Sequence, residues 1–513
     1  LLGELEAVAL GAALVVAPVL HVVRVHLHGL RPRVLHGEGL VDMVAEGLVV
    51  DEGHGDPNVY TFWSEKFNAP VAKSKYIVSV KAKKTEWRNL YSFSGITVYP
   101  SYYLNKIDGS TYVEKYQFEM MPGSGPYILN SQRTTQENNG LIVLDRKLDY
   151  WASQHSRNTG LYNFDVLEFI FINDETQEVE RFFAGDYDTY MVSRAQWWAE
   201  KFVASEYSEI ERGLIQRKKF INFLPAGVGG LAFNTLEAPF DDIKVRKAFT
   251  HLWDVEKLMD KLFYHEYVRK NSWFPRSKYA NPDNPTQDFN PELALELLKE
   301  AGWTKKPGDK LLSKDGKYFE IENFYISQGW DRIFNPLVKD LEEVGIKINL
   351  VVLQNTFEKL MDRKFQVQFA GWTGSLLPSP EGMLHSKYSE KLDVTNVTGM
   401  ANPDIDRLIE DYNTNWNMDE RVKILQQIDE IASKEYHWAF GWGAPYGYRC
   451  LNWDKFGMPK HGIGYSGNWL SPISYWWIDP NKKDRLTKAR QNPNSSIPIE
   501  NEIVDFWNNL KAK

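Results

Sequence analysis

The chain has 513 residues, of which 43% are hydrophobic and 25% charged, and its formal net charge is −8 at pH 7. A chain of this length exceeds one compact core, so two or three domains are expected. The acidic balance argues against nucleic acid as a partner, because phosphate binding depends on clustered Lys and Arg. The single cysteine, Cys450, excludes an internal disulfide and fits a cytosolic or a bacterial periplasmic protein.

Tryptophan is the unusual component, with 18 residues in the chain, and aromatic residues make up 14% of it. Such a content is expected mainly from large hydrophobic cores. Flat indole rings also line clefts that hold peptide side chains or sugars, so a ligand platform remains a second interpretation.

Residues 1–55 differ in composition from the rest of the chain. They include no Lys, Ser, Thr, Asn, Gln, Ile, Phe, Tyr, Trp or Cys, but five of the eleven histidines. The residue types that remain have GC-rich codons, so we expect a segment that is not native, such as a wrong reading frame would give. Its apolar stretch lacks the basic start of a signal peptide and is interrupted too early for a membrane-spanning helix, so no localisation follows from it.

From about residue 56 the pattern is mixed α/β. The stretch 76–80 alternates like a strand, 123–129 predicts a glycine turn feeding a strand, and 141–144 predicts its hairpin partner. The stretch 164–192 predicts a strand, a helix and a second strand, with Asp174 or Thr176 as the N-cap of the helix and Gly185 at its end.

The stretch 230–254 predicts a buried strand followed by a buried helix. Gly230–Phe233 is a short apolar run, Pro239 interrupts it, and Asp241 and Asp242 offer an N-cap and negative charge for a helix. Apolar residues then recur at helical spacing, which predicts a core-facing side made of Val245, Ala248, Phe249 and Leu252.

Further elements follow in the second half of the chain. Asn290 and Pro291 predict the start of a helix, and Asp315-Gly316 predicts a hairpin turn. A strand at 318–326, a helix at 330–344 and a strand at 346–353 predict parallel strands joined by a right-handed crossover. Helices are also expected at 403–412 and 418–434, and an irregular stretch at 453–480.

No linear enzyme motif is present. The sequence contains no phosphate-binding GxxxxGK[ST] loop, no HExxH, no CxxC and no GxSxG. Gly123-Ser124-Gly125 precedes Pro126, which has no N–H to offer a phosphate, so a turn is predicted there. The histidines lack a ligand spacing, and we expect no metal, no cofactor and no enzymatic activity, although catalytic groups can also meet only in space.

Six segments, in order, resemble the extracellular solute-binding proteins of family 5, which are the oligopeptide- and dipeptide-binding receptors of ABC importers. The segments are GSGPYIL, LDRKLDYW, FINDETQEVERFFAGDYDTYMV, FNTLEAPFDDIKVRKAFTHLWD, FNPELALELLKEAGW and FAGWTGSLLPSPEG. The resemblance runs from about residue 56 to residue 480. Within the family, 158–171 and 371–409 resemble the branch associated with peptides and peptide antibiotics of the microcin C type.

The resemblance implies an α/β fold of the two-lobed, type II periplasmic-binding-protein class, with mixed sheets and an interlobe hinge. The lobes would close over a soluble ligand without changing it, and a membrane permease would recognise the closed form. The implied protein is a monomer in the periplasm or on the cell-envelope exterior of a bacterium. Its implied partners are a peptide or peptide-like ligand and the permease of an ABC importer.

The resemblance also implies a division of the chain. After the anomalous segment 1–55 we expect a remnant of the smaller second domain at 56–121, the first lobe at 122–238 and the C-terminal lobe at 239–465. The stretch 466–513 would return to the first lobe and end in a tail. Family chains have a sizeable second domain before the segment that matches Val59 onward, so the remnant is expected to be incomplete.

Five residues are candidate ligand contacts by the same resemblance. In many family members an aspartate after the Trp of the GW segment holds the ligand's amine, and here Ser375 takes that place after Trp372. Trp372 is expected to be either a cleft wall or a core residue. Glu381 is the nearest replacement for the amine anchor, with a plain helix-start acid as the alternative, and Asn396 and Arg269 are further candidates.

Two other functions remain open from the sequence. The first is an oligosaccharide receptor of the same fold. The second is a secreted glycan-acting enzyme, motivated by the tryptophan content and the many carboxylates, which would need a close carboxylate pair in a cleft.

Overall fold

The structure is a computed structural model that describes residues 63–69, 71–74, 77–94, 103, 122–135, 140–172 and 174–511. The anomalous segment 1–55 and much of the expected remnant 56–121 lie outside the described residues. Among the described residues, no helix is long and apolar enough to cross a membrane.

The chain divides into two compact units, each made of segments that are distant in sequence. Unit 1 contains the described residues up to Met191 together with 212–220 and 450–506. Unit 2 contains 192–211, 221–449 and the described residues 507–511. The final return to unit 1 therefore comes at Cys450, earlier than the expected position 466.

Unit 1 contains two main sheets. The first is antiparallel, in the order β3-β4-β5, and its β3–β4 pairing confirms the predicted hairpin: β3 Tyr127–Leu129, β4 Leu141–Arg146 and β5 Val166–Ile170. The second has the order β21-β7-β18-β6: β21 Ile503–Val504, β7 Ile215–Phe220, β18 Tyr448–Trp453 and β6 Thr189–Met191. Smaller elements complete the unit: β1 Val71–Ser74, β2 Ile77–Ser79, α4 Trp87–Ser94, β19 Phe456–Gly457, α17 Ser471–Tyr475, β20 Trp477–Ile478 and α18 Pro480–Gln491.

Helix α7 (Glu175–Ala184) shows how the sequence signals act in unit 1. The Asp174 side chain caps the helix by accepting a hydrogen bond from the backbone N–H of Gln177, and Gly185 ends it in the left-handed region at φ 91°. Phe182 is fully buried and packs against Tyr190 and Trp453. The predicted strand, helix and strand of 164–192 are therefore confirmed.

A three-stranded antiparallel sheet lies at the centre of unit 2, in the order β15-β8-β16. The middle strand, β8 (Gly229–Phe233), is buried along its whole length, as the apolar run predicted. Its neighbours are β15 (Val367–Gly371) and β16 (Trp438–Phe440). Because both partners are more than 130 residues away in the chain, β8 is held by long-range contacts.

Strand β8 and helix α9 (Ile243–His251) share one core and lie on either side of the lobe boundary that the sequence led us to expect at 238/239. Asp242 caps the helix, and its predicted apolar side is fully buried. The Phe240 ring stacks on Phe233 at 4.8 Å between centroids and meets Phe249 edge-on at 5.0 Å. This aromatic packing puts the strand and the helix in unit 2 together, within the segment of that unit that runs from Ile221 to Arg449.

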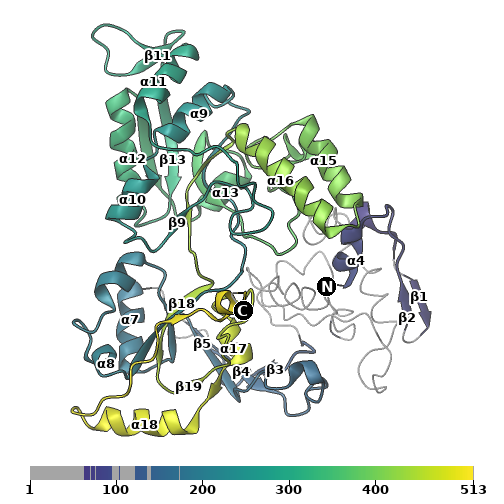
Figure 1. Ribbon diagram of the computed structural model, residues 1–513, viewed down its shortest axis with the longest axis vertical. Coiled ribbons are helices and arrows are strands. Elements are labelled where there is room, and N and C mark those ends of the chain that lie inside the picture. Colours follow the sequence, from purple (N-terminus) through teal and green to yellow (C-terminus); the bar gives the residue numbers. More distant parts are fainter. Residues whose placement is uncertain are drawn as a thin grey trace. The chain divides into compact units, whose positions relative to one another are not determined.

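The predicted strand–helix–strand unit is also confirmed. Strands β13 (Glu320–Ile326) and β14 (Lys347–Val352) are parallel and are joined by α12 (Asp331–Val344). Figure 1 shows α12 beside β13, and α12 contributes Phe334 and Leu341 to the core that also holds α9. The N-cap of the predicted helix α11 (Pro291–Glu300) is Asn290.

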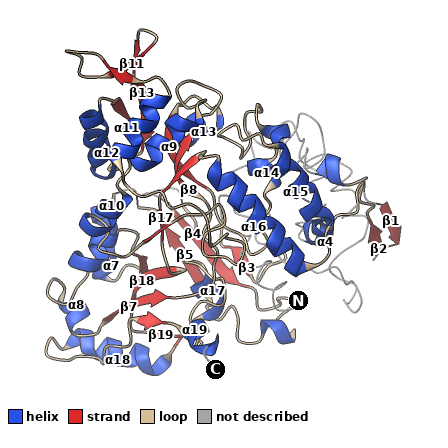
Figure 2. Cartoon of the chain, turned by 45° about the horizontal axis from the view of Figure 1, so that its top comes forward, coloured by secondary structure: helices blue, strands red, loops and turns tan. Residues whose placement is uncertain are grey.

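Helices α15 (Pro403–Thr414) and α16 (Met418–Lys434) pack side by side in unit 2, as Figures 1 and 2 show. The predicted bounds of α16 agree with the structure. The remaining α-helices and β-strands are α8 Ser208–Glu211, α10 Val255–Lys261, β9 Val268–Arg269, β10 Thr304–Lys305, β11 Leu312–Lys314, β12 Lys317–Tyr318, α13 Thr356–Met361, α14 Glu381–Leu384, β17 Trp442–Gly443 and α19 Phe506–Lys511.

Candidate functional site

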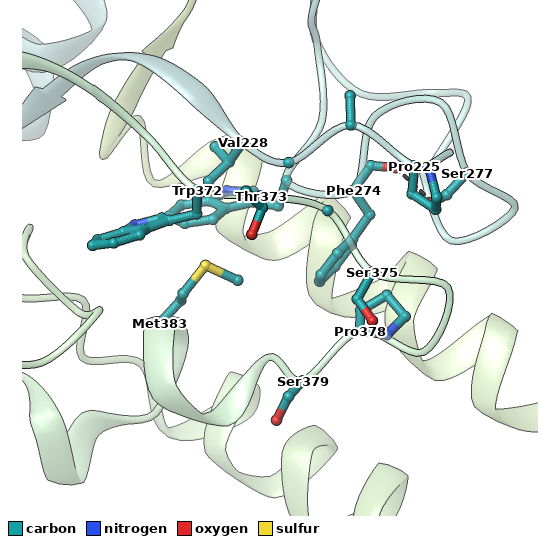
Figure 3. A pocket seen from close by; sticks show the side chains of 14 residues that line it. Pro225, Val228, Phe274, Ser277, Trp372, Thr373, Ser375, Pro378, Ser379 and Met383 are labelled. Carbon is teal, nitrogen blue, oxygen red and sulfur yellow. Dashed lines mark hydrogen bonds between the residues drawn. The ribbon is translucent and has the colours of Figure 1, made fainter. Parts of the chain in front are cut away.

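A pocket of about 90 Å³ lies within unit 2, beside the segments that extend β8 and β15. Figure 3 shows how its walls come from four short segments. They are Pro225–Val228, which leads into β8, the loop residues Trp273, Phe274 and Ser277, the segment Trp372–Ser375, which leaves β15, and Pro378, Ser379 and Met383. This volume suits one side chain or a comparably small group, since sites for whole drug-sized ligands occupy about 300–1,000 Å³.

Two of the segments are in main-chain contact where they form the pocket. The Trp372 N–H donates to the Val228 carbonyl oxygen at 2.9 Å and so continues the pairing of β8 with β15. A Cβ on Gly227 would lie 1.6 Å from the Trp372 carbonyl oxygen, and one on Gly374 would lie 2.3 Å from the Pro225 carbonyl oxygen. Glycine is therefore required at both positions, because only the absence of Cβ lets the two chains approach this closely.

Aromatic and thioether groups form the interior of the pocket. In Figure 3 the Met383 side chain extends toward the space between the Trp372 and Phe274 rings. Trp372 is half-buried and meets Phe357 edge-on at 6.3 Å. The indole N–H groups of Trp372 and Trp273 are buried and have no hydrogen-bond partner among the described residues. The surface is thus apolar, with two indole donors unsatisfied nearby.

The loop that carries Trp273 and Phe274 is held by one buried carboxylate. Asp429, on α16, is fully buried and accepts hydrogen bonds of 2.7–2.8 Å. Burial raises the pKa of Asp429, and its hydrogen bonds partly offset that rise. The donors are the Ser272 hydroxyl, the Trp273 and Asn281 backbone N–H groups and the Asn284 amide.

The segment on the opposite wall is held by two phenolic hydroxyls. Tyr279 donates to the Leu376 carbonyl oxygen at 2.9 Å, and Tyr412 donates to the Pro378 carbonyl oxygen at 2.7 Å. Both bonds end on main-chain atoms. They therefore fix the course of this segment whatever side chains it carries.

The structure brings two of the five predicted contacts to the pocket. Trp372 and Ser375 both line it, and the Ser375 hydroxyl oxygen accepts a hydrogen bond from the Leu377 N–H at 3.2 Å. Sequence reasoning missed Gly227, Trp273 and Met383. The glycine-rich run PAGVGG before β8 was the available signal for the first of these.

The other three predicted contacts do not line this pocket and have internal partners. The Glu381 carboxylate pairs with Lys387 at 2.5 Å. Burial lowers the pKa of Lys387, but the hydrogen bond and charge of Glu381 outweigh this effect and raise that pKa to about 12. Asn396 is buried. Its side-chain NH₂ group donates to the Met400 carbonyl oxygen, and its side-chain oxygen accepts from the Met400 N–H. Arg269 donates to the Gln287 carbonyl oxygen at 2.5 Å, and burial lowers its pKa. Their ligand roles stay predictions.

Within the part of the chain that the structure describes, no group of three or more His, Cys, Asp or Glu side chains is placed to hold a metal ion. Cys450, the single cysteine of the chain, is buried.

Residues 48–392 match the model of the bacterial extracellular solute-binding proteins, family 5. The chain belongs to this family. The predicted resemblance is therefore confirmed over most of its extent, and the family is one of solute-binding proteins.

The relatives include an uncharacterised protein YejA of Escherichia coli, which is 26% identical over 403 residues, or 71% of this chain and 65% of the relative. A probable peptide-binding protein YejA of Agrobacterium fabrum is 23% identical over 400 residues, or 69% of this chain and 63% of the relative. The matched part thus spans less than two thirds of these relatives' length.

Among solved structures, the oligopeptide-binding protein AppA of Bacillus subtilis in complex with a nonapeptide is similar, with a TM-score of 0.70. The match covers 87% of this chain and 84% of that one at 21% identity. At this identity the likeness shows the fold, and it confirms the predicted α/β, type II class.

Proposed function

We propose that this protein captures peptides or peptide-like compounds outside the cytoplasmic membrane of a bacterium and delivers them unchanged, as a monomer, to the permease of an ABC importer. The main support is the family membership of residues 48–392, which is a solute-binding family. The name of the Agrobacterium relative and the nonapeptide in AppA favour peptides as the ligand class. Binding without chemical change is the proposed mode, so the recovered ligand should have its original mass.

The pocket beside β8 and β15 is the proposed subsite for one apolar side chain of the ligand. Trp372, Phe274 and Met383 supply the apolar wall, and the volume of about 90 Å³ fits a single side chain. Full burial of a leucine or similar side chain is worth about 1.5–3 kcal/mol. Main-chain groups that bind a ligand's backbone do not select its sequence, so a subsite of this kind would supply a side-chain preference.

Truncating Trp372 tests this subsite. In the parent protein, a tetrapeptide with one leucine is expected to bind about tenfold or more tightly than tetra-alanine, since tenfold corresponds to about 1.4 kcal/mol. The Trp372→Ala variant is expected to lose that leucine preference, as measured by titration calorimetry. Trp416→Ala is the matched control, because Trp416 is 61% exposed in the same unit and does not line the pocket. An unchanged leucine preference in Trp372→Ala would remove the pocket from the site.

An oligosaccharide receptor is the second candidate, favoured by the tryptophan wall. Mass spectrometry of ligand that co-purifies with the full chain separates the two, since a bound peptide supports the proposal and a bound sugar overturns it. Titration calorimetry with an added oligosaccharide, mannohexaose, tests sugar binding directly. Release of reducing ends from such a sugar would instead indicate the glycan-acting enzyme.

A further inference from the structure

Lys270 is a cation of unit 2 that the rest of the fold does not use. It follows β9, and its backbone N–H donates to the Gly441 carbonyl oxygen at 2.9 Å. The side chain is more than half buried, yet its ammonium group has no hydrogen bond and no ion pair with any residue that the structure describes. A lysine that is mostly buried ordinarily has a carboxylate or carbonyl partner for its ammonium group, because reducing the hydration of that charge is costly.

Two glycines make the space in which this side chain lies. A Cβ on Gly443 would be 2.8 Å from Lys270 Cε, and a Cβ on Gly229 would be 2.9 Å from Lys270 Nζ. The lysine stem therefore crosses one glycine and presents its ammonium over the other, at the first residue of β8. Because glycine has no side chain, neither Gly229 nor Gly443 places an acidic group beside the ammonium.

The ammonium lies at the same end of the sheet as the pocket. Gly229 follows Val228, which lines the pocket, and Gly229 pairs with Gly371, the residue before Trp372. The same Cβ position on Gly229 is 3.6 Å from the Gly371 Cα atom. The ammonium therefore lies one residue along β8 from the pocket lining, above the Cβ position of Gly229.

Burial lowers the pKa of Lys270 from its ordinary 10.5 to about 8, and no carboxylate among the described residues opposes the shift. The amine is still mainly protonated at pH 7. It is a charge held at a cost to stability, as is common for groups placed for binding.

We propose that Lys270 binds the carboxylate of the ligand, so that the captured compounds carry an acidic group next to the side chain in the pocket. This inference rests on the proposed function and gives it a ligand class, that of acidic peptides or peptides with a free carboxyl end. An ammonium–carboxylate hydrogen bond is among the stronger polar contacts when it is partly desolvated.

The test uses the full chain and matched peptides in titration calorimetry. The parent is expected to bind tetra-alanine with a free carboxyl end about tenfold more tightly than its C-terminal amide. Lys270→Met is expected to abolish this difference by weakening the binding of the peptide with the free carboxyl end. Lys261→Met is the control, because Lys261 is exposed at the end of α10 and the substitution makes the same change of charge. The amidated peptide Ala-Ala-Glu-Ala separates the two sources, since tight binding of it indicates a side-chain carboxylate.

Several results would overturn the inference. Equal affinity of the parent for acidic and amidated peptides would exclude carboxylate binding by Lys270 but not peptide capture. A Lys270→Met variant that still binds the acid more tightly than the amide would have the same meaning. Failure of every peptide to bind removes the proposed function and this inference with it. The melting temperature of Lys270→Met is the control for misfolding. Because the substitution removes a partly desolvated charge, this temperature should be equal to or above that of the parent. That gap should be largest at pH 7 and shrink between pH 8 and 10.5, as the folded and then the unfolded amine lose their protons.

Discussion

Gly227→Ala is expected to lower the free energy of unfolding of unit 2 by at least about 3 kcal/mol and to abolish ligand binding. The new methyl group would lie 1.6 Å from the Trp372 carbonyl oxygen, and the nearest atoms are main chain. No side-chain rotation relieves such a clash, so the segments before β8 and after β15 must separate. Urea unfolding followed by circular dichroism, together with peptide calorimetry, measures both effects.

Gly123→Ala is the matched control for this substitution. The nearest atom to a Cβ on Gly123 is the Gly125 nitrogen, at 3.9 Å, and Gly123 has no positive φ. The control should change stability by less than about 1 kcal/mol and leave binding intact. Gly374→Ala, with its Cβ 2.3 Å from the Pro225 carbonyl oxygen, should resemble Gly227→Ala. A stable, ligand-binding Gly227→Ala protein would show that the close approach of these two segments is not needed.

Asp429→Ala is expected to destabilise unit 2 by about 3–5 kcal/mol, because it leaves several buried donors without an acceptor. It should also weaken ligand binding, since the Trp273 and Asn281 N–H groups that it releases anchor a pocket wall. Asp429→Asn should lie between the parent and Asp429→Ala. Its amide keeps one acceptor oxygen but turns a donor toward other donors. Chemical denaturation and calorimetry on the same samples give both quantities.

Glu430→Ala provides the comparison on the same helix. The Glu430 side chain is 47% exposed and pairs with Lys434 at 2.6 Å, one turn away, so its loss should cost less than about 1 kcal/mol. If Asp429→Ala were no worse than Glu430→Ala, the buried carboxylate could not be what organises the 272–284 loop.

Local signals in the sequence predicted much of the fold. Capping residues, glycine stops and apolar periodicity act within a few residues of one another, and they placed α7, α9, α11 and α16 and the parallel pair β13–β14. Unit membership was harder to predict. Strand β8 belongs to unit 2 because it pairs with β15 and β16, and no short stretch of sequence contains that information.

The candidate site was only partly predictable for a related reason. Trp372 and Ser375 could be found because they follow a recognisable GW segment. Met383 and Trp273 reach the same pocket from other parts of the chain, through contacts such as those of Asp429. Lys270 was missed because its property is the lack of a partner, which a sequence cannot show. The large aromatic content went mainly to cores, with Trp198, Trp253, Trp438 and Trp476 all buried.

The two tyrosine hydroxyls on the pocket wall have a consequence for how ligand preference can change. The Tyr279 and Tyr412 hydroxyls donate hydrogen bonds to the carbonyl oxygens of Leu376 and Pro378. These bonds hold the main chain and do not depend on the neighbouring side chains. Ser379 can therefore be exchanged to change which ligands the protein accepts while its scaffold stays intact. A library randomised at Ser379 should yield mostly folded proteins with divergent ligand spectra, whereas Ser375 also accepts the hydrogen bond of the Leu377 N–H.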